Sequence, residues 1–237
     1  MKIKALFQKI VAPEGHTCMV CGDDLVYESP YALCRGCDLV YNDGNRCVHC
    51  GRALHGEGHV CNGCKTYKCA FAEARSALVY EGNSRVVVRR FKFRAQPHLA
   101  RPLAELMVSA LVTTAWIADA LVYVPMTKKA EYNRGYNQSR LLAEEIEKLT
   151  DLPVLPALRV IGDKKVQSAL SAAARWKAVA GVFGTADIDL KGKRLILIDD
   201  ILTTGATADA CATALKKAGA KTVYLLTIAS TADKKMV

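Results

Sequence analysis

The sequence lacks several patterns that would each assign it to a class of protein. No apolar run reaches the roughly 18 residues of a membrane-spanning helix, so we expect no membrane insertion. The first residues, MKIKALFQKIVAPEG, contain no continuous apolar stretch and no small-residue cleavage site, so we expect a cytosolic protein. No G-x-x-x-x-G-K-[ST] occurs, which argues against a P-loop NTPase. No G-x-G-x-x-G follows a strand pattern, which argues against a dinucleotide-binding protein.

Cysteine, in contrast, is abundant, with 10 among 237 residues. Eight of them form four C-x-x-C pairs: Cys18/Cys21, Cys34/Cys37, Cys47/Cys50 and Cys61/Cys64. Two such pairs complete a tetrahedral four-thiolate zinc site, so the spacing predicts two structural Zn2+ ions. Pairing in order gives two zinc ribbons, and a cross-braced pairing of first with third and second with fourth is the alternative. His49, His55 and His59 could substitute as ligands, whereas Cys69 and Cys211 are expected to be ordinary buried or loop cysteines.

The length of the chain allows one full-sized domain and a smaller one. Because the cysteine pairs end near Lys68, we expect a double zinc ribbon over residues 1–70 and a second domain over residues 71–237. The first part carries 8 basic and 7 acidic side chains, and the second carries 25 and 16. The positive charge of the larger part suits a polyphosphate ligand or nucleic acid, and equally suits solubility alone.

Strand and helix patterns alternate through the larger part. Strands are expected at 76–80, 120–124, 194–198 and 221–228, and helices at 98–117, 136–149, 172–179 and 205–218. Residues 125–135 are expected to form a loop, and residues 156–192 to be rich in loops. The alternation predicts an α/β fold with a central, mostly parallel sheet flanked by helices. Ligands of such sheets bind at the carboxyl ends of the strands.

The stretch LILIDDILTTGAT, residues 195–207, lies at one such strand end. Its small residues allow successive backbone N–H groups to converge on an anion at a helix N-terminus. Asp199 and Asp200 would repel a bare phosphate, but they could accept hydrogen bonds from the hydroxyls of a phosphorylated sugar. Mg2+, held mainly by substrate oxygens, would also screen their charge. The alternative is a solvated acidic turn before a helix cap.

This stretch resembles the phosphoribosyl pyrophosphate (PRPP) motif of type I phosphoribosyltransferases. The resemblance implies that Asp199 and Asp200 accept hydrogen bonds from the 2′- and 3′-hydroxyls of the ribose. It also implies a cradle for the 5′-phosphate, formed by Thr203, Thr204, Gly205, Ala206 and Thr207.

Residues 124–146 and the cysteine-rich head resemble ComF-type competence proteins, which carry Arg-Gly-Phe-Asn-Gln where this chain has RGYNQ at 134–138. This resemblance covers almost the whole chain. It implies a type I phosphoribosyltransferase fold with a small N-terminal zinc-ribbon domain, PRPP and Mg2+ as ligands, and a link to DNA uptake.

Within this family framework, pyrophosphate would lie at the loop of residues 125–129, with Lys128 and Lys129 as charge partners, or else as solvated side chains. Arg134 could clamp phosphate oxygens or pin the loop to the acidic strand end. Residues 162–179 correspond to a mobile hood over the site. Its expected lid residues are Lys164, which stands where ComF-type chains commonly have threonine, Lys165, Gln167 and Arg175.

Hypotheses from different classes of function stay open. An enzyme would displace pyrophosphate at C1 of PRPP, although no residue can be named as its general base and no acceptor pocket is evident. A non-catalytic, single-stranded DNA-binding competence factor would use the site only to bind a ligand. Its DNA would contact residues 85–98, where Arg89, Arg90, Lys92 and Arg94 are interleaved with Phe91 and Phe93. The same run could be an amphipathic element whose phenylalanines face the core. The zinc ribbons could also dock a partner helicase.

Overall fold

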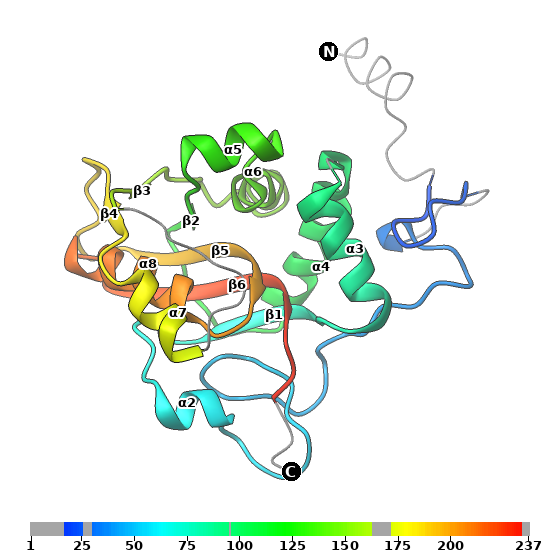
Figure 1. The fold of residues 1–237 in the computed structure, drawn as a ribbon, viewed down its shortest axis with the longest axis horizontal. Coiled ribbons are helices and arrows are strands. Elements are labelled where there is room, and N and C mark those ends of the chain that lie inside the picture. The colour runs from blue at the N-terminus through cyan, green and yellow to red at the C-terminus, as the bar shows by residue number, and fades with distance from the viewer. Residues whose placement is uncertain (1–16, 26–29, 95, 163–171, 234–237) are drawn as a thin grey trace.

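A computed structural model describes residues 17–25, 30–94, 96–162 and 172–233. The centre of the fold is a four-stranded parallel sheet with the strand order β1-β6-β5-β2 (Figure 1). Its strands are β1 (Ala74–Val79), β2 (Ala120–Tyr123), β5 (Arg194–Leu202) and β6 (Thr222–Ser230). The predicted α/β fold with a parallel sheet is therefore confirmed.

Helices cover both faces of this sheet (Figure 1). One face carries α3 (Gly82–Phe93), α4 (Ala100–Leu111) and α6 (Gln138–Thr150), and the other carries α7 (Ala172–Val179) and α8 (Ala206–Lys217). The alternation of side chains along β5 explains this sandwich, since Leu195 and Leu197 belong to the α8 side whereas Ile196 and Ile198 belong to the α4 side. All four side chains are at most 1% exposed.

Smaller elements complete the described part of the chain. They are η1 (Pro30–Ala32), α2 (Asn62–Thr66), η2 (Pro97–Leu99), α5 (Lys128–Arg134), β3 (Leu158–Val160) and β4 (Phe183–Thr185). β3 and β4 form a separate antiparallel pair beside α8. Among the described residues, no helix is both long enough and apolar enough to cross a bilayer.

The expected helix over residues 98–117 is too long at its C-terminal end. The segment starts with the 3₁₀ turn η2, and the helix that follows it, α4, ends at Leu111. The hydroxyl groups of Thr113 and Thr114 donate to the carbonyls of Ala110 and Leu111 at 2.8 and 2.7 Å. Because these hydroxyls satisfy carbonyls of the last turn, the helix stops there.

The predicted loop over residues 125–135 is wrong, because it contains α5. Thr127 caps this helix by accepting a hydrogen bond from the Ala130 N–H at 3.1 Å. Gly135 ends it with a left-handed φ of +86°. The strand predicted at 194–198 is also too short, since β5 continues to Leu202 by pairing with β6. Asp199 and Asp200 are therefore part of the strand.

The cysteine-rich segment lies along β1, which is an edge strand of the sheet. The Asn42 N–H donates to the Ala77 carbonyl at 3.0 Å, and the Ala74 N–H donates to the His49 carbonyl at 2.9 Å. Cys47 and Cys50 are buried in the same hydrophobic cluster as the α8 side of the sheet. The segment therefore covers a strand edge that would otherwise be open to pairing. The division at residue 70 stays a prediction.

Candidate functional site

The eight paired cysteines form two groups in space. One group is Cys18, Cys21, Cys34 and Cys37, and the other is Cys47, Cys50, Cys61 and Cys64. Within each group all four sulfurs lie within 4.8 Å of one another. Pairing in order is therefore confirmed and the cross-braced alternative is wrong, while the three neighbouring histidines belong to neither group.

The spacing of the sulfurs fits zinc. A tetrahedral ion with Zn–S bonds of about 2.3 Å places its ligand sulfurs roughly 3.8 Å apart. The Sγ atoms of Cys21 and Cys34 are 3.7 Å apart, and those of Cys50 and Cys61 are 3.5 Å apart. Since four cysteines fill all positions, both sites would be structural. Of the remaining cysteines, Cys211 is fully buried, as expected of an ordinary core residue.

The two aspartates of the motif lie at the carboxyl end of β5. Asp199 Oδ1 accepts hydrogen bonds from Ser139 Oγ at 3.1 Å and from the Asp200 N–H at 2.9 Å. Asp200 Oδ1 accepts one from the Ile201 N–H at 2.7 Å, and Asp200 Oδ2 forms an ion pair with Lys92 Nζ at 2.6 Å. The side chain of Asp200 is only 10% exposed, so Lys92 neutralises a carboxylate that would otherwise be buried and unpaired.

The turn after β5 leads directly into α8. Gly205 precedes this helix with a φ of +85°, which favours glycine because it has no Cβ. Thr204 Oγ1 accepts a hydrogen bond from the Ala206 N–H at 3.4 Å. Asp209, in the first turn of α8, accepts one from the Ala70 N–H at 2.6 Å. Burial raises the pKa of the Asp209 carboxyl, and this hydrogen bond acts in the opposite direction. The positive end of α8 thus adjoins the turn.

A cavity of about 630 Å³ joins these features. Its walls come from the ends of β5 and β2, which are neighbours in the sheet, and from α3, α5, α6 and α7. Motif residues on its lining are Asp199, Asp200, Thr203, Thr204, Ala206 and Thr207. Gly205 lies behind them, buried, in the same turn. The arrangement places carboxylate acceptors and the backbone N–H groups at the start of a helix within one space.

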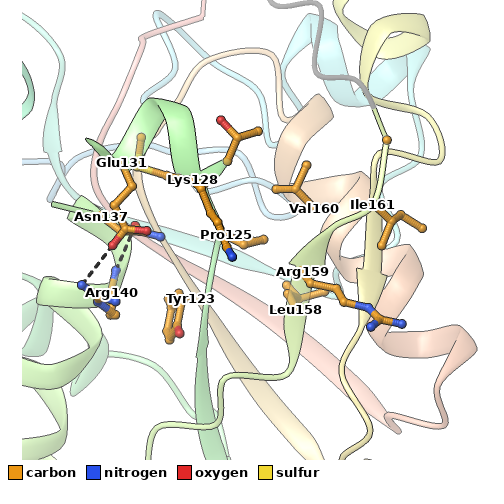
Figure 2. Close-up of a pocket in the computed structure, with 13 residues that line it drawn as sticks. Tyr123, Pro125, Lys128, Glu131, Asn137, Arg140, Leu158, Arg159, Val160 and Ile161 are labelled. Carbon is orange, nitrogen blue, oxygen red and sulfur yellow. Dashed lines mark hydrogen bonds and ion pairs between the residues drawn. The ribbon is translucent and has the colours of Figure 1, made fainter. Parts of the chain in front are cut away.

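A second cavity, of about 780 Å³, shares the loop of residues 125–127 with the first one. Figure 2 shows Glu131 and Arg140 on one side of it and Arg159 and Ile161 on the other. Arg140 Nη2 and Glu131 Oε1 form an ion pair at 3.0 Å. Lys128, from the start of α5, lies between these two sides (Figure 2).

The predicted pyrophosphate and lid residues have different outcomes. Lys128 and Lys129 are exposed in the first turn of α5 instead of in a loop. Arg134 lines the first cavity, and its Nη1 donates to Gln138 Oε1 at 2.8 Å, so its hydrogen bond does not go to the acidic strand end. Residues outside the described part of the chain are Lys164, Lys165 and Gln167, together with the side chain of Arg175 on α7. The roles of all of them stay predictions.

Arg52 is a neighbour of the motif that the sequence did not suggest. It directly follows Cys50 and Gly51, and its guanidinium donates to the Thr203 carbonyl and, at 2.7 Å, to Thr231 Oγ1. Its position next to Gly51 and the Cys47/Cys50 pair is its only signal in the sequence, and that signal does not indicate a partner more than 150 residues away.

The basic run at 85–98 is mostly α3. Phe91 is fully buried, while Phe93 is 63% exposed. Arg90 donates to the carbonyls of Met19 and Val20 at 3.2 and 2.7 Å, which ties α3 to the first cysteine group. The expectation that the phenylalanines face the core therefore holds for only one of them, and Arg90 serves the fold.

Comparison with known proteins supports the assignment of the domain. Residues 131–237 match the family model of the phosphoribosyl transferase domain. Competence protein F of Haemophilus influenzae is 26% identical over 88% of this chain and 94% of its own length. Competence protein ComFC of Bacillus subtilis is 29% identical over 74% of this chain and 73% of its own. DNA utilization protein YhgH of Escherichia coli O157:H7 is 22% identical over 82% and 88%. The chain is thus similar to ComF-type competence proteins over most of its length, with a phosphoribosyl transferase domain matched over residues 131–237 and two four-cysteine groups consistent with an N-terminal double zinc ribbon.

Proposed function

We propose that this protein binds PRPP with Mg2+ in the cavity at the carboxyl ends of β5 and β2, and transfers its phosphoribosyl group with release of pyrophosphate. The names of the homologues, two competence proteins and a DNA utilization protein, support a role in DNA uptake or use. The observation that carries the proposal is the junction of two carboxylates with an N–H-rich turn in one cavity. Few ligands other than a phosphorylated sugar would suit both.

The proposed binding mode follows from the chemistry of each wall. The 5′-phosphate would lie on the turn of residues 203–207, where backbone N–H groups and the α8 dipole favour an anion. The ribose hydroxyls would donate to the carboxylates of Asp199 and Asp200, which line this part of the cavity. Pyrophosphate would lie toward the loop of residues 125–127, near Lys128. Mg2+ would be held mainly by oxygens of the ligand and would offset their negative charge.

Lys92 has a specific part in this mode. Its ion pair neutralises the charge of Asp200 before a ligand binds. It also holds the carboxylate in place on the cavity wall, which both residues line. A sugar hydroxyl can share Asp200 with Lys92, because a carboxylate has lone pairs for several donors. The cation also lowers the repulsion between the aspartates and the phosphates of the ligand. This explains how two acidic side chains can adjoin an anion-binding turn.

Catalysis would consist mainly of charge stabilisation. As the bond at C1 breaks, negative charge develops on pyrophosphate, and cations near the leaving group stabilise it. Lys128 directly follows the shared loop of residues 125–127, so it is the cation that we expect near the leaving group. Turnover separates this proposal from its alternative, a single-stranded DNA-binding competence factor that only binds PRPP as a ligand.

Isothermal titration of PRPP with Mg2+ tests the binding mode. The double variant Asp199→Asn/Asp200→Asn should weaken binding by about a hundredfold or more, because each lost charged acceptor is worth about 1.5–3 kcal/mol. The matched control is Asp187→Asn/Asp189→Asn, which removes the same charge from an exposed pair outside the cavity lining. If the wild-type protein shows neither heat nor a thermal shift with PRPP, the proposal is wrong.

Release of pyrophosphate on addition of nucleobases then distinguishes transfer from binding. For the alternative, the affinity for a single-stranded oligonucleotide should fall steeply with salt and should depend on Arg89, which is exposed on α3. An oligonucleotide that binds with no release of pyrophosphate by any base would favour the alternative.

A further inference from the structure

An exposed aromatic ring lies on the wall of the candidate PRPP cavity. Phe93 is the last residue of α3 and keeps 63% of its surface exposed, although it lines the same cavity as Asp199 and Asp200. The hydrophobic effect disfavours such exposure, and Phe91, two residues earlier, is completely buried. The helix therefore does not need Phe93 for its own packing.

Two cations flank this ring. Lys92 Nζ lies 6.0 Å from the centre of the Phe93 ring, and Arg134 Cζ lies 5.6 Å from it. Both distances are near the outer limit of a cation–π contact, so neither cation covers the ring closely. Arg134 is held by its hydrogen bond to Gln138, and Lys92 by its ion pair with Asp200. The ring thus has fixed, positively charged neighbours and an accessible surface.

Lys92 also relates the ring to the expected position of the sugar. Its Nζ is 2.6 Å from Asp200 Oδ2 and 6.0 Å from the ring centre, so a single ammonium group connects the proposed diol acceptor with Phe93. In a nucleotide, the base is attached to C1, next to the 2′-hydroxyl. A ribose whose hydroxyls bind Asp199 and Asp200 would therefore place a substituent on C1 within reach of this ring.

We propose that Phe93 is the stacking platform for a planar heterocyclic base, either the acceptor of the phosphoribosyl group or the base of the nucleotide product. This inference rests on the proposed function, because it places the base relative to a bound ribose phosphate. Stacking on an aromatic side chain suits every base, and a neighbouring guanidinium adds attraction for its π face. Phe93 would thus set a preference for flat aromatic acceptors without selecting one base.

The test compares ligands that differ only by the base. Ribose 5-phosphate, AMP and CMP are titrated into the holo protein, and the ratio of their affinities isolates the base. We expect both nucleotides to bind the wild type about tenfold or more tightly than ribose 5-phosphate, the range for one stacked base. In Phe93→Leu this advantage should fall to about twofold or less, with the affinity for ribose 5-phosphate unchanged. Phe93→Trp should retain the advantage, because it keeps an aromatic face.

A control variant and the possible outcomes separate this inference from the proposed function. Tyr132→Leu removes another exposed ring, 88% exposed on α5 and absent from the cavity lining, and should not change the ratio. If ribose 5-phosphate binds but the nucleotides bind no more tightly, or if Phe93→Leu keeps the full advantage, this inference is overturned and the proposed function stands. If ribose 5-phosphate itself does not bind, the proposed function fails first. Because Phe93 is mostly exposed, its variants should fold normally, which a thermal melt verifies.

Discussion

Replacing Arg52 with methionine tests whether the cysteine-rich segment positions the turn proposed to bind the 5′-phosphate. The change keeps an apolar stem comparable to that of arginine and removes the guanidinium that donates to the Thr203 carbonyl and to Thr231 Oγ1. In a trans peptide, the carbonyl of one residue and the N–H of the next point in opposite directions. By holding the Thr203 carbonyl, Arg52 therefore fixes the direction of the Thr204 N–H, one of the groups proposed to bind phosphate.

The size of the effect follows from these two hydrogen bonds. A hydrogen bond from a charged donor contributes about 1.5–3 kcal/mol, and the lower value applies at Thr203 because this contact is exposed. The contact with Thr203 acts on the turn directly, whereas Thr231 lies just beyond the end of β6 and donates its N–H to the Leu202 carbonyl at 3.1 Å. A loss of about 1.5 kcal/mol corresponds to an affinity about tenfold weaker. Arg52→Lys should recover part of it, because an ammonium lacks the fork needed to reach both acceptors in fixed geometry.

Titration calorimetry with ribose 5-phosphate measures this effect without the pyrophosphate group. Arg46→Met is the matched control, because Arg46 lies in the same segment but donates to the Asn42 carbonyl at 3.3 Å, not to the turn. Zinc content must be equal in all variants, so that a change in affinity is not a loss of metal. If Arg52→Met binds ribose 5-phosphate as tightly as Arg46→Met does, the reasoning about the turn is refuted.

Two further predictions concern the cysteine groups. Metal analysis should return about two zinc ions per chain, and one ion per chain would contradict this. A chelator should lower both the melting temperature and the affinity for ribose 5-phosphate, so an unchanged affinity would also contradict the prediction. Gly51→Ala should destabilise the fold in chemical denaturation by about 1–3 kcal/mol more than Gly56→Ala. A Cβ at Gly51 would lie 2.2 Å from the Ala74 carbonyl oxygen, whereas a Cβ at Gly56 would meet no neighbouring atom within 4 Å. Both glycines have positive φ, at +65° and +89°, so equal losses would mean that backbone strain alone matters.

The parts of the site that the sequence predicted are local in the chain. The strand, the two aspartates and the small-residue turn occupy 13 consecutive residues, 195–207, so their order alone places them at one strand end. The cysteine groups were predictable for a similar reason, since metal chemistry fixes both the residue type and the short spacing. Continuous apolar runs were enough to predict the buried strands, because both faces of the sheet are covered.

The parts that the sequence missed depend on contacts between distant segments. The ion pair of Lys92 with Asp200 joins residues more than 100 positions apart, and nothing in the basic run marks one lysine among its neighbours. Burial of Phe91 and exposure of Phe93 depend on how α3 packs, which an interleaved basic and aromatic pattern does not fix. The end of β5 was missed because two adjacent aspartates usually indicate that a buried strand has ended. Here the pairing with β6 continues through Leu202.

Each cysteine group supports a different wall of the candidate site through one arginine. Beside the first group, Arg90 donates to the carbonyls of Met19 and Val20, and this anchors the helix that carries Lys92 and Phe93. Beside the second group, Arg52 holds the turn proposed to bind phosphate. One wall would then face the base and the diol, and the other would face the phosphate. Loss of the first metal should therefore weaken the contribution of the base, and loss of the second should weaken the binding of phosphate. The cysteine-rich segment would then support the site from two sides. A separate domain with no contacts to these two walls would not do so.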